Sequence, residues 1–234
     1  MKMRHLSWLW LALPIVISLL AFRQTAPPQV KEAEPVVPPA LTSAAAQKTA
    51  KLPPASLPEV RAAIKRVFAG AVQLDTAHIP IFITADLNCD GSEDLAAVVH
   101  PVSLRLADLN GEVANWIVQD ALSSPANHIK VQAGQELLVI IHGYGTKGWR
   151  TSEAQQTYVL LNAVGQDMRT TSAAGLLGAM HARPASIRCE ALQEKIGGEP
   201  GYLFWGGARY IWRAEAVLAR LHALARPVSP HSMQ

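Results

Sequence analysis

The sequence predicts an α+β domain, in which an antiparallel β-sheet built from hairpins is flanked by an N-terminal and a C-terminal helix. Short apolar runs follow one another around turn residues, which is typical of hairpins. Apolar residues at helical spacing occur before the first of these runs and after the last one. No unit of roughly 20–50 residues repeats, which excludes a solenoid or a propeller. Consecutive hairpins with a helix at each end favour one α+β domain.

Residues 1–22 predict a signal peptide or an N-terminal membrane anchor. Residues 1–5 are positively charged, and residues 6–22 form an apolar run of 17 residues. That length is long for the core of a signal peptide and shorter than the about 20 residues of a transmembrane helix. No convincing small-x-small cleavage site follows the run directly, because Ala21 has Leu19 and Ala26 has Gln24 two positions before it, and no lipidation cysteine stands there. The sequence leaves both alternatives open, and both place the rest of the chain in the cell envelope, membrane-anchored, or secreted or periplasmic.

The remaining chain divides into three segments by composition. Residues 23–57 are rich in Pro, Ala, Val and Thr, which predicts an extended, semi-rigid tether. Residues 58–226 carry the periodic apolar patterns and form the predicted globular domain. Residues 227–234 follow the last apolar pattern and are expected to be a disordered tail.

The distribution of charge argues against a nucleic-acid partner. The formal net charge is +3, but residues 1–26 contain three basic residues and no acidic one. Removing those three from 21 basic residues leaves 18, which balance the 18 acidic residues. A nucleic-acid-binding domain is expected to carry a basic face. We therefore expect membrane contact through the N-terminal segment and no nucleic acid, and a protein or glycan partner stays unspecified.

The first predicted helix begins near Ser56. Ser56 and Glu59 have the spacing of a capping box, and Pro58 stands in the first turn, where proline is tolerated. The apolar residues that follow at helical spacing are Val60, Ile64, Val67, Phe68 and Ala71.

The sequence period changes to that of strands after residue 79. Two β-rich runs surround an acidic turn and predict a hairpin, and a second hairpin is predicted around Gly206-Gly207. A small helix is predicted at residues 172–180, and a C-terminal helix around residues 217–224. The predicted strands are residues 81–84, 95–99, 116–118, 137–141, 157–161, 202–205 and 209–212.

The acidic turn of the first hairpin carries the strongest chemical signal. Loop positions 1, 3, 5 and 9 are Asp86, Asn88, Asp90 and Asp94, and Gly91 at position 6 permits the left-handed backbone of a tight turn. Calcium takes about six to eight oxygen ligands in a flexible cage. These side chains, a main-chain carbonyl and water would supply them. The loop therefore predicts a structural Ca²⁺ site, and the alternative is a solvated acidic turn without metal.

This loop resembles the calcium-binding loop of FG-GAP and VCBS-type repeats, whose pattern is Asp-x-Asn-Gly-Asp-Gly-x-x-Asp-Leu between two strands. Cys89 departs from that pattern, because the family usually has glycine there. The EF-hand is a poorer match, because position 12 is Ala97 instead of a bidentate glutamate. More loosely, the chain resembles exported bacterial proteins with one such loop and a later aromatic hairpin. Those proteins have no assigned activity, so the resemblance does not suggest one for this chain. By the resemblance, the metal ligands would be the side chains of Asp86, Asn88, Asp90 and Asp94 and the main chain of Ser92.

Cys89 and Cys189 are the two cysteines of the chain. Outside the cytoplasm they are able to form a disulfide, which would attach the acidic loop to a distant segment. The sequence leaves a disulfide and two free thiols open.

Two other functions are weighed against a calcium-binding, non-enzymatic module of the cell envelope. His142-Gly143 after an apolar strand resembles the oxyanion strand of α/β-hydrolases, which would make the chain a small exported hydrolase. However, that fold needs a Gly-x-Ser-x-Gly nucleophile elbow, and no serine of the chain has glycine two positions before it and two positions after it. The histidines also lack the sequence spacing of a zinc site. The second alternative is a carbohydrate- or peptide-binding module. Its platform would be the aromatic hairpin of Tyr202, Trp205, Tyr210 and Trp212.

Overall fold

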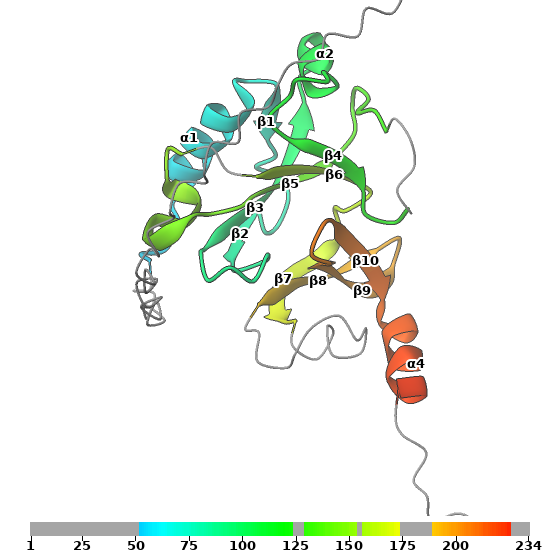
Figure 1. Ribbon diagram of the computed structural model, residues 1–234. Helices are drawn as coiled ribbons and strands as arrows, with labels where there is room; N and C mark the ends of the chain where they lie inside the picture. The colour runs from blue at the N-terminus through cyan, green and yellow to red at the C-terminus, as the bar shows by residue number, and fades with distance from the viewer. Residues whose placement is uncertain (1–51, 124–128, 154–155, 174–188, 226–234) are drawn as a thin grey trace, which may run out of the picture. The chain divides into compact units, whose positions relative to one another are not determined.

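A computed structural model describes residues 52–123, 129–153, 156–173 and 189–225 (Figure 1). The predicted export segment, nearly all of the tether and the predicted tail lie outside these residues. So do residues 174–180 of the helix predicted at 172–180. The described residues contain helices and two mostly antiparallel sheets, which confirms the predicted α+β class. None of the described helices is both long and apolar enough to cross a membrane.

The strands form two sheets, where the sequence suggested one. The first sheet has the order β1-β3-β5-β6-β4, and β2 also pairs with β3. The second sheet has the order β10-β9-β8-β7. The strands of the first sheet are β1 (Val72–Leu74), β2 (Phe82–Ala85), β3 (Asp94–Pro101), β4 (Ile117–Asp120), β5 (Leu137–Ile141) and β6 (Thr157–Leu161). Those of the second are β7 (Gln166–Ser172), β8 (Glu190–Ile196), β9 (Glu199–Trp205) and β10 (Tyr210–Ala214).

Helix α1 (Leu57–Phe68) begins where its sequence predicts, and it ends before Ala71, the last residue of the predicted apolar pattern. The N–H of Ser56 donates to the carboxylate of Glu59 at 2.9 Å, as a capping box requires. The helix ends at Ala69, which adopts the left-handed conformation with φ 50°. Its apolar side packs on the first sheet. The other helical segments are η1 (Ser103–Arg105), α2 (Leu106–Leu109), η2 (Gly145–Arg150) and α4 (Glu215–Ala225).

The central strands of the first sheet are buried on both faces. On β3, Leu95, Ala97 and Val99 join the core under α1, whereas Ala96 and Val98 join the core shared with the second sheet. Strands covered on both faces are continuously apolar. This explains why β3, β5 and β6 were recognisable as apolar runs.

Three features of the sheets were not predicted. Strand β4 runs parallel to β6, with Ile117 opposite Tyr158, although all strands were expected to be antiparallel. Strands β7 and β8 are largely polar, so their sequences gave no apolar run. Ser172, the predicted start of a helix, is the last residue of β7 and pairs with Glu190. The pairing with β8 overrides the local helical signal at this residue.

Glu194 on β8 is a buried carboxyl group with an incomplete set of hydrogen bonds. Its side chain is 2% exposed. The N–H of Gly165 donates to Oε2 at 3.0 Å, and Oε1 has no partner among the described residues. Burial raises the pKa of Glu194 to about 8, and the hydrogen bond from Gly165 opposes that rise.

We expect Glu194 to make the protein less stable as pH rises. A carboxyl group with a raised folded-state pKa keeps its proton in the folded state when the unfolded state has lost it. The contribution of Glu194 to the free energy of unfolding should therefore fall from about pH 4 to about pH 8, by a few kcal/mol in order of magnitude. Glu194→Gln should flatten this dependence in urea denaturation measured across that range. Equal slopes for the variant and the unmutated protein would show that Glu194 does not titrate in this way.

Candidate metal-binding loop

The acidic loop connects β2 to β3, as predicted. Ala85 pairs with Asp94 at the base of the hairpin, so the two ends of the loop are held side by side. Asp90 and Gly91 are exposed at the tip, whereas Ser92 and Asp94 are buried. The predicted ligands therefore extend from the surface into the interior of the domain.

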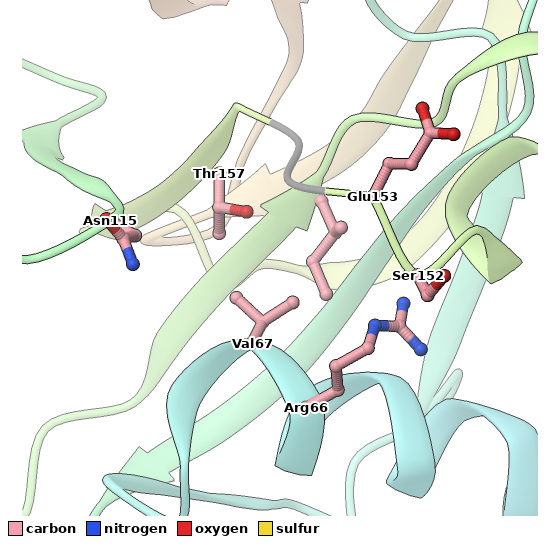
Figure 2. Close-up of a pocket in the computed structure, with 7 residues that line it drawn as sticks. Arg66, Val67, Asn115, Ser152, Glu153 and Thr157 are labelled. Atoms are coloured by element: carbon pink, nitrogen blue, oxygen red, sulfur yellow. The ribbon is translucent and has the colours of Figure 1, made fainter.

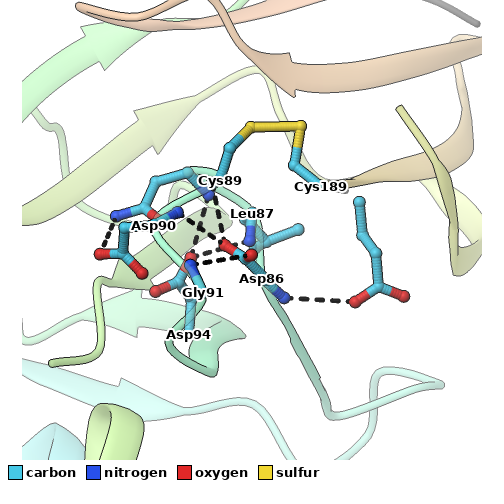
Figure 3. The surroundings of a disulfide bond; sticks show 9 residues. Asp86, Leu87, Cys89, Asp90, Gly91, Asp94 and Cys189 are labelled. Atoms are coloured by element: carbon cyan, nitrogen blue, oxygen red, sulfur yellow. Dashed lines mark hydrogen bonds between the residues drawn. A yellow bond between two sulfur atoms is a disulfide. The ribbon is translucent and has the colours of Figure 1, made fainter. Parts of the chain in front are cut away.

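Asp86 organises the turn through its carboxylate. Oδ1 accepts hydrogen bonds from the N–H groups of Cys89 at 2.9 Å and Asp90 at 3.2 Å, and Oδ2 accepts one from Gly91 at 3.1 Å (Figure 3). Gly91 has φ 85° and Cys89 has φ 69°. Glycine adopts this conformation without steric cost. Cys89 thus occupies a left-handed position at which a glycine would be unstrained.

Asp94 connects the two ends of the loop to β5. Its side chain is 0% exposed. Oδ2 accepts hydrogen bonds from the N–H groups of Leu87 at 2.8 Å and Asn88 at 3.2 Å. Oδ1 accepts one at 2.7 Å from Gly143, which lies just beyond β5. This one carboxylate holds three backbone amides, two of them in the loop itself.

The remaining predicted ligands bond to one another at the tip. Asn88 Nδ2 donates to Asp90 Oδ2 at 2.9 Å, and the N–H of Asp90 donates to Asn88 Oδ1 at 3.1 Å. The N–H of Ser92 donates to Asp90 Oδ1 at 2.7 Å. The two bonds from backbone N–H groups are local Asx-type turns, which leave further acceptor sites on the same oxygens.

The loop carries negative charge that the described residues do not neutralise. Burial first, and then repulsion from Asp90, raises the pKa of Asp86 to about 6. Burial is also the main cause that raises the pKa of Asp94 to about 8, with repulsion from Asp90 and Asp86 added. Among the described residues, no ion pair involves these three carboxylates. A cation in the loop would remove the repulsion and favour the ionised forms.

Glu93, the other acid of the loop, does have a cationic partner. Arg150 Nη1 donates to Glu93 Oε1 at 2.7 Å, and Trp149 Nε1 donates to the same oxygen at 2.9 Å. The Arg150 guanidinium also lies over the Trp149 ring, 4.4 Å from its centroid. No sequence pattern indicates this pair, because Arg150 follows Glu93 by 57 residues.

The loop is fastened to the second sheet as well. Cys89 and Cys189 form a disulfide across a sequence separation of 100 residues (Figure 3). Next to it, the N–H of Glu190 donates to the carbonyl of Asp86 at 2.8 Å, and the N–H of Asp86 donates to Glu190 Oε2 at 3.2 Å. The loop therefore joins the β2–β3 hairpin to the start of β8.

The His142-Gly143 turn supports the loop. A Cβ atom at Gly143 would lie 2.1 Å from the carbonyl oxygen of Glu93, so glycine is required for this close approach. The N–H of Gly143 donates a hydrogen bond to Asp94 Oδ1. His142 is buried, which lowers its pKa to about 4, and its Nε2 atom lies 2.8 Å from the Tyr210 hydroxyl. This partner is a tyrosine instead of a serine or cysteine nucleophile, so the geometry does not favour the hydrolase alternative.

The aromatic hairpin belongs mainly to the core between the sheets. Tyr210 is 1% exposed, and Tyr202, Trp205 and Trp212 are partly buried. The rings of Trp205 and Tyr210 lie 5.1 Å apart and pack against Tyr158. A binding platform would need at least two fully exposed rings on one face, so this arrangement does not favour the carbohydrate- or peptide-binding alternative.

A surface pocket of about 210 Å³ lies between α1 and the ends of β5 and β6 (Figure 2). Ligand pockets for drug-sized molecules are usually about 300–1,000 Å³, which is larger. The guanidinium of Arg66, one of its lining residues, donates to the carbonyl of Trp149 at 2.9 Å. The pocket is lined by Arg66, Val67, Asn115, Ile141, Ser152, Glu153 and Thr157.

A second group of metal-ligating side chains lies away from the loop. Asp75, His100 and Glu136 each offer one atom that could bind a metal, and these three atoms all lie within 4.8 Å of one another. In the part of the chain that the structure describes, Asp86, Asp90 and Asp94 do not form an equally close trio. The loop carboxylates turn toward backbone amides instead. The described residues thus contain a possible metal-binding triad that no sequence spacing revealed.

Comparisons of the chain with protein-family models, with curated proteins and with solved structures find no match.

Proposed function

We propose that the chain is an exported or membrane-anchored, non-enzymatic domain whose β2–β3 loop binds a structural Ca²⁺ ion. In this proposal it serves as a binding or structural module of the cell envelope. The observation that carries the proposal is the set of three loop carboxylates, Asp86, Asp90 and Asp94, none of which has an ion-pair partner among the described residues.

The hydrogen bonds of the loop are compatible with a metal. A carboxylate offers about four lone-pair sites, and an amide oxygen offers two. The carboxylates of Asp86 and Asp94 each accept three hydrogen bonds, so each has one lone-pair site left for a metal. The Asp90 carboxylate accepts two hydrogen bonds and has two lone-pair sites left. Asn88 Oδ1 accepts one and keeps one. The main-chain carbonyl at Ser92 and water would supply the rest of a calcium shell.

The position of the loop favours a structural role for the ion. The loop is bonded to β5 through Asp94 and to the start of β8 through Asp86 and Cys89. An ion that fixes the loop would therefore stabilise the connection between the two sheets. The disulfide supports a location outside the cytoplasm, because such bonds persist in oxidising compartments. Extracellular calcium modules bind at about 10⁻⁴–10⁻³ M, which suits a site exposed to abundant calcium.

Calcium is expected to raise the thermal melting temperature relative to chelator. At a free calcium concentration about ten times the Kd, the stabilisation is about 1.4 kcal/mol, or roughly 3–6 °C for a domain of this size. Asp86→Ala/Asp90→Ala should abolish the shift, and the milder Asp90→Asn should reduce it while the apo protein stays folded. An unchanged melting temperature for the unmutated protein with calcium and with chelator would refute the proposal.

A further inference from the structure

Three neighbouring strands bring Asp75, His100 and Glu136 together. Strand β3, which carries His100, pairs with β1 on one side and with β5 on the other. Asp75 directly follows β1, and Glu136 directly precedes β5. Val99, next to His100, pairs with both Leu74 and Leu137. The antiparallel register therefore places all three side chains at the same end of the first sheet.

The Asp75 carboxylate is held in place by hydrogen bonds from the backbone. Oδ1 accepts hydrogen bonds from the N–H groups of Ala77 at 2.8 Å and His78 at 3.3 Å. Oδ2 remains directed at His100 Nε2, at 3.0 Å.

The imidazole of His100 is oriented from its other side. Nδ1 lies 3.4 Å from the main-chain carbonyl oxygen of Gln135. In the neutral tautomer whose Nδ1–H donates to this carbonyl, the lone pair of Nε2 is directed at the carboxylate. Two acceptors that face each other at this distance need a proton or a metal ion between them. Metal-bound histidines commonly have this second hydrogen bond to a carbonyl.

The donor set indicates the class of metal. One imidazole nitrogen and two carboxylate oxygens suit a borderline divalent transition ion such as Zn²⁺ better than Ca²⁺, which takes oxygen ligands only. Ligand atoms around a tetrahedral zinc lie about 3.3 Å apart, so Asp75 and His100 are already close to that spacing. Glu136 is exposed and can adjust toward the other two.

We propose that Asp75, His100 and Glu136 form a second metal site, which takes a divalent transition ion of the zinc type. Three protein ligands leave a fourth coordination position open to water or to a ligand. The site shares no residue with the calcium loop and does not depend on it. The acidic loop offers only oxygen donors, so the two sites differ in the metal that they prefer.

Calorimetric titration of the full chain with Zn²⁺ tests this site, with excess Ca²⁺ present to occupy the acidic loop. We expect saturable binding that weakens at least about tenfold in His100→Ala and in Glu136→Gln. Glu112→Gln, which removes an exposed carboxylate elsewhere, should leave the affinity unchanged. With Co²⁺ as the probe, the visible absorption bands should weaken in the same two variants.

Two outcomes would overturn the proposal. One is the absence of saturable Zn²⁺ binding to the unmutated chain. The other is binding that is equally tight in His100→Ala and Glu136→Gln, which would assign Zn²⁺ to other histidines and leave Asp75 and His100 as an ion pair alone. Because Glu136 is exposed, Glu136→Gln keeps the test valid even where His100→Ala fails to fold.

Discussion

Removing the Cys89–Cys189 disulfide is expected to lower the free energy of unfolding by about 2–5 kcal/mol. The bond links residues 100 positions apart, and cross-links that close long loops restrict the unfolded chain most in the chain-entropy account. The folded protein also loses one of the attachments between the acidic loop and the start of β8. Urea denaturation of Cys89→Ala/Cys189→Ala, which keeps a Cβ atom at position 89, against the oxidised protein measures this loss.

A second double variant separates the cross-link from the backbone conformation. Cys89 has φ 69°, which glycine adopts freely and alanine adopts at a cost of about 1–2 kcal/mol. Cys89→Ala/Cys189→Ala should therefore be less stable than Cys89→Gly/Cys189→Ala by about that amount. If Cys89→Ala/Cys189→Ala matched the oxidised protein within about 0.5 kcal/mol, the disulfide would have no substantial stabilising role.

Asp94→Ala is expected to cost at least about 3 kcal/mol even without calcium. The substitution leaves the amides of Leu87, Asn88 and Gly143 without their acceptor. Each unsatisfied buried donor costs about 1–3 kcal/mol, less where water reaches it. Chemical denaturation in the presence of chelator measures this loss separately from any effect of calcium.

Two matched substitutions distinguish the structural role of Asp94 from metal binding. Asp94→Asn keeps one acceptor oxygen and should lose less stability than Asp94→Ala. Asp90→Asn changes an exposed carboxylate at the tip, so it should weaken calcium binding with little effect on the apo protein. An apo form of Asp94→Ala as stable as the unmutated protein would contradict the role assigned to this carboxylate.

The sequence predicted those parts of the fold whose signals are local. The capping box predicted where α1 begins. The apolar runs predicted the positions of β5 and β6 closely, because burial on both faces makes such strands continuously apolar. The turn of the acidic loop was also predictable, since its side chains bond to nearby backbone amides.

Features that depend on distant pairing were not predictable. Polar strands such as β7 gave no apolar run, and the parallel pairing of β4 with β6 depends on strand order. The Asp75–His100 contact spans 25 residues and arises from the β1–β3 register. The His-Gly turn shows the same limit. Its sequence suggested an oxyanion strand, whereas the amide of Gly143 bonds to Asp94.

Calcium stoichiometry measured by equilibrium dialysis tests the central claim most directly. The full chain is compared with Asp86→Asn/Asp90→Asn, which keeps the size of both side chains and removes two charges from the loop. We predict one calcium ion per chain for the unmutated protein, at a Kd of about 10⁻⁴–10⁻³ M, and none for the variant at the same concentration. No bound calcium in the unmutated protein, or equal binding by the variant, would contradict the assignment of this loop as a calcium site.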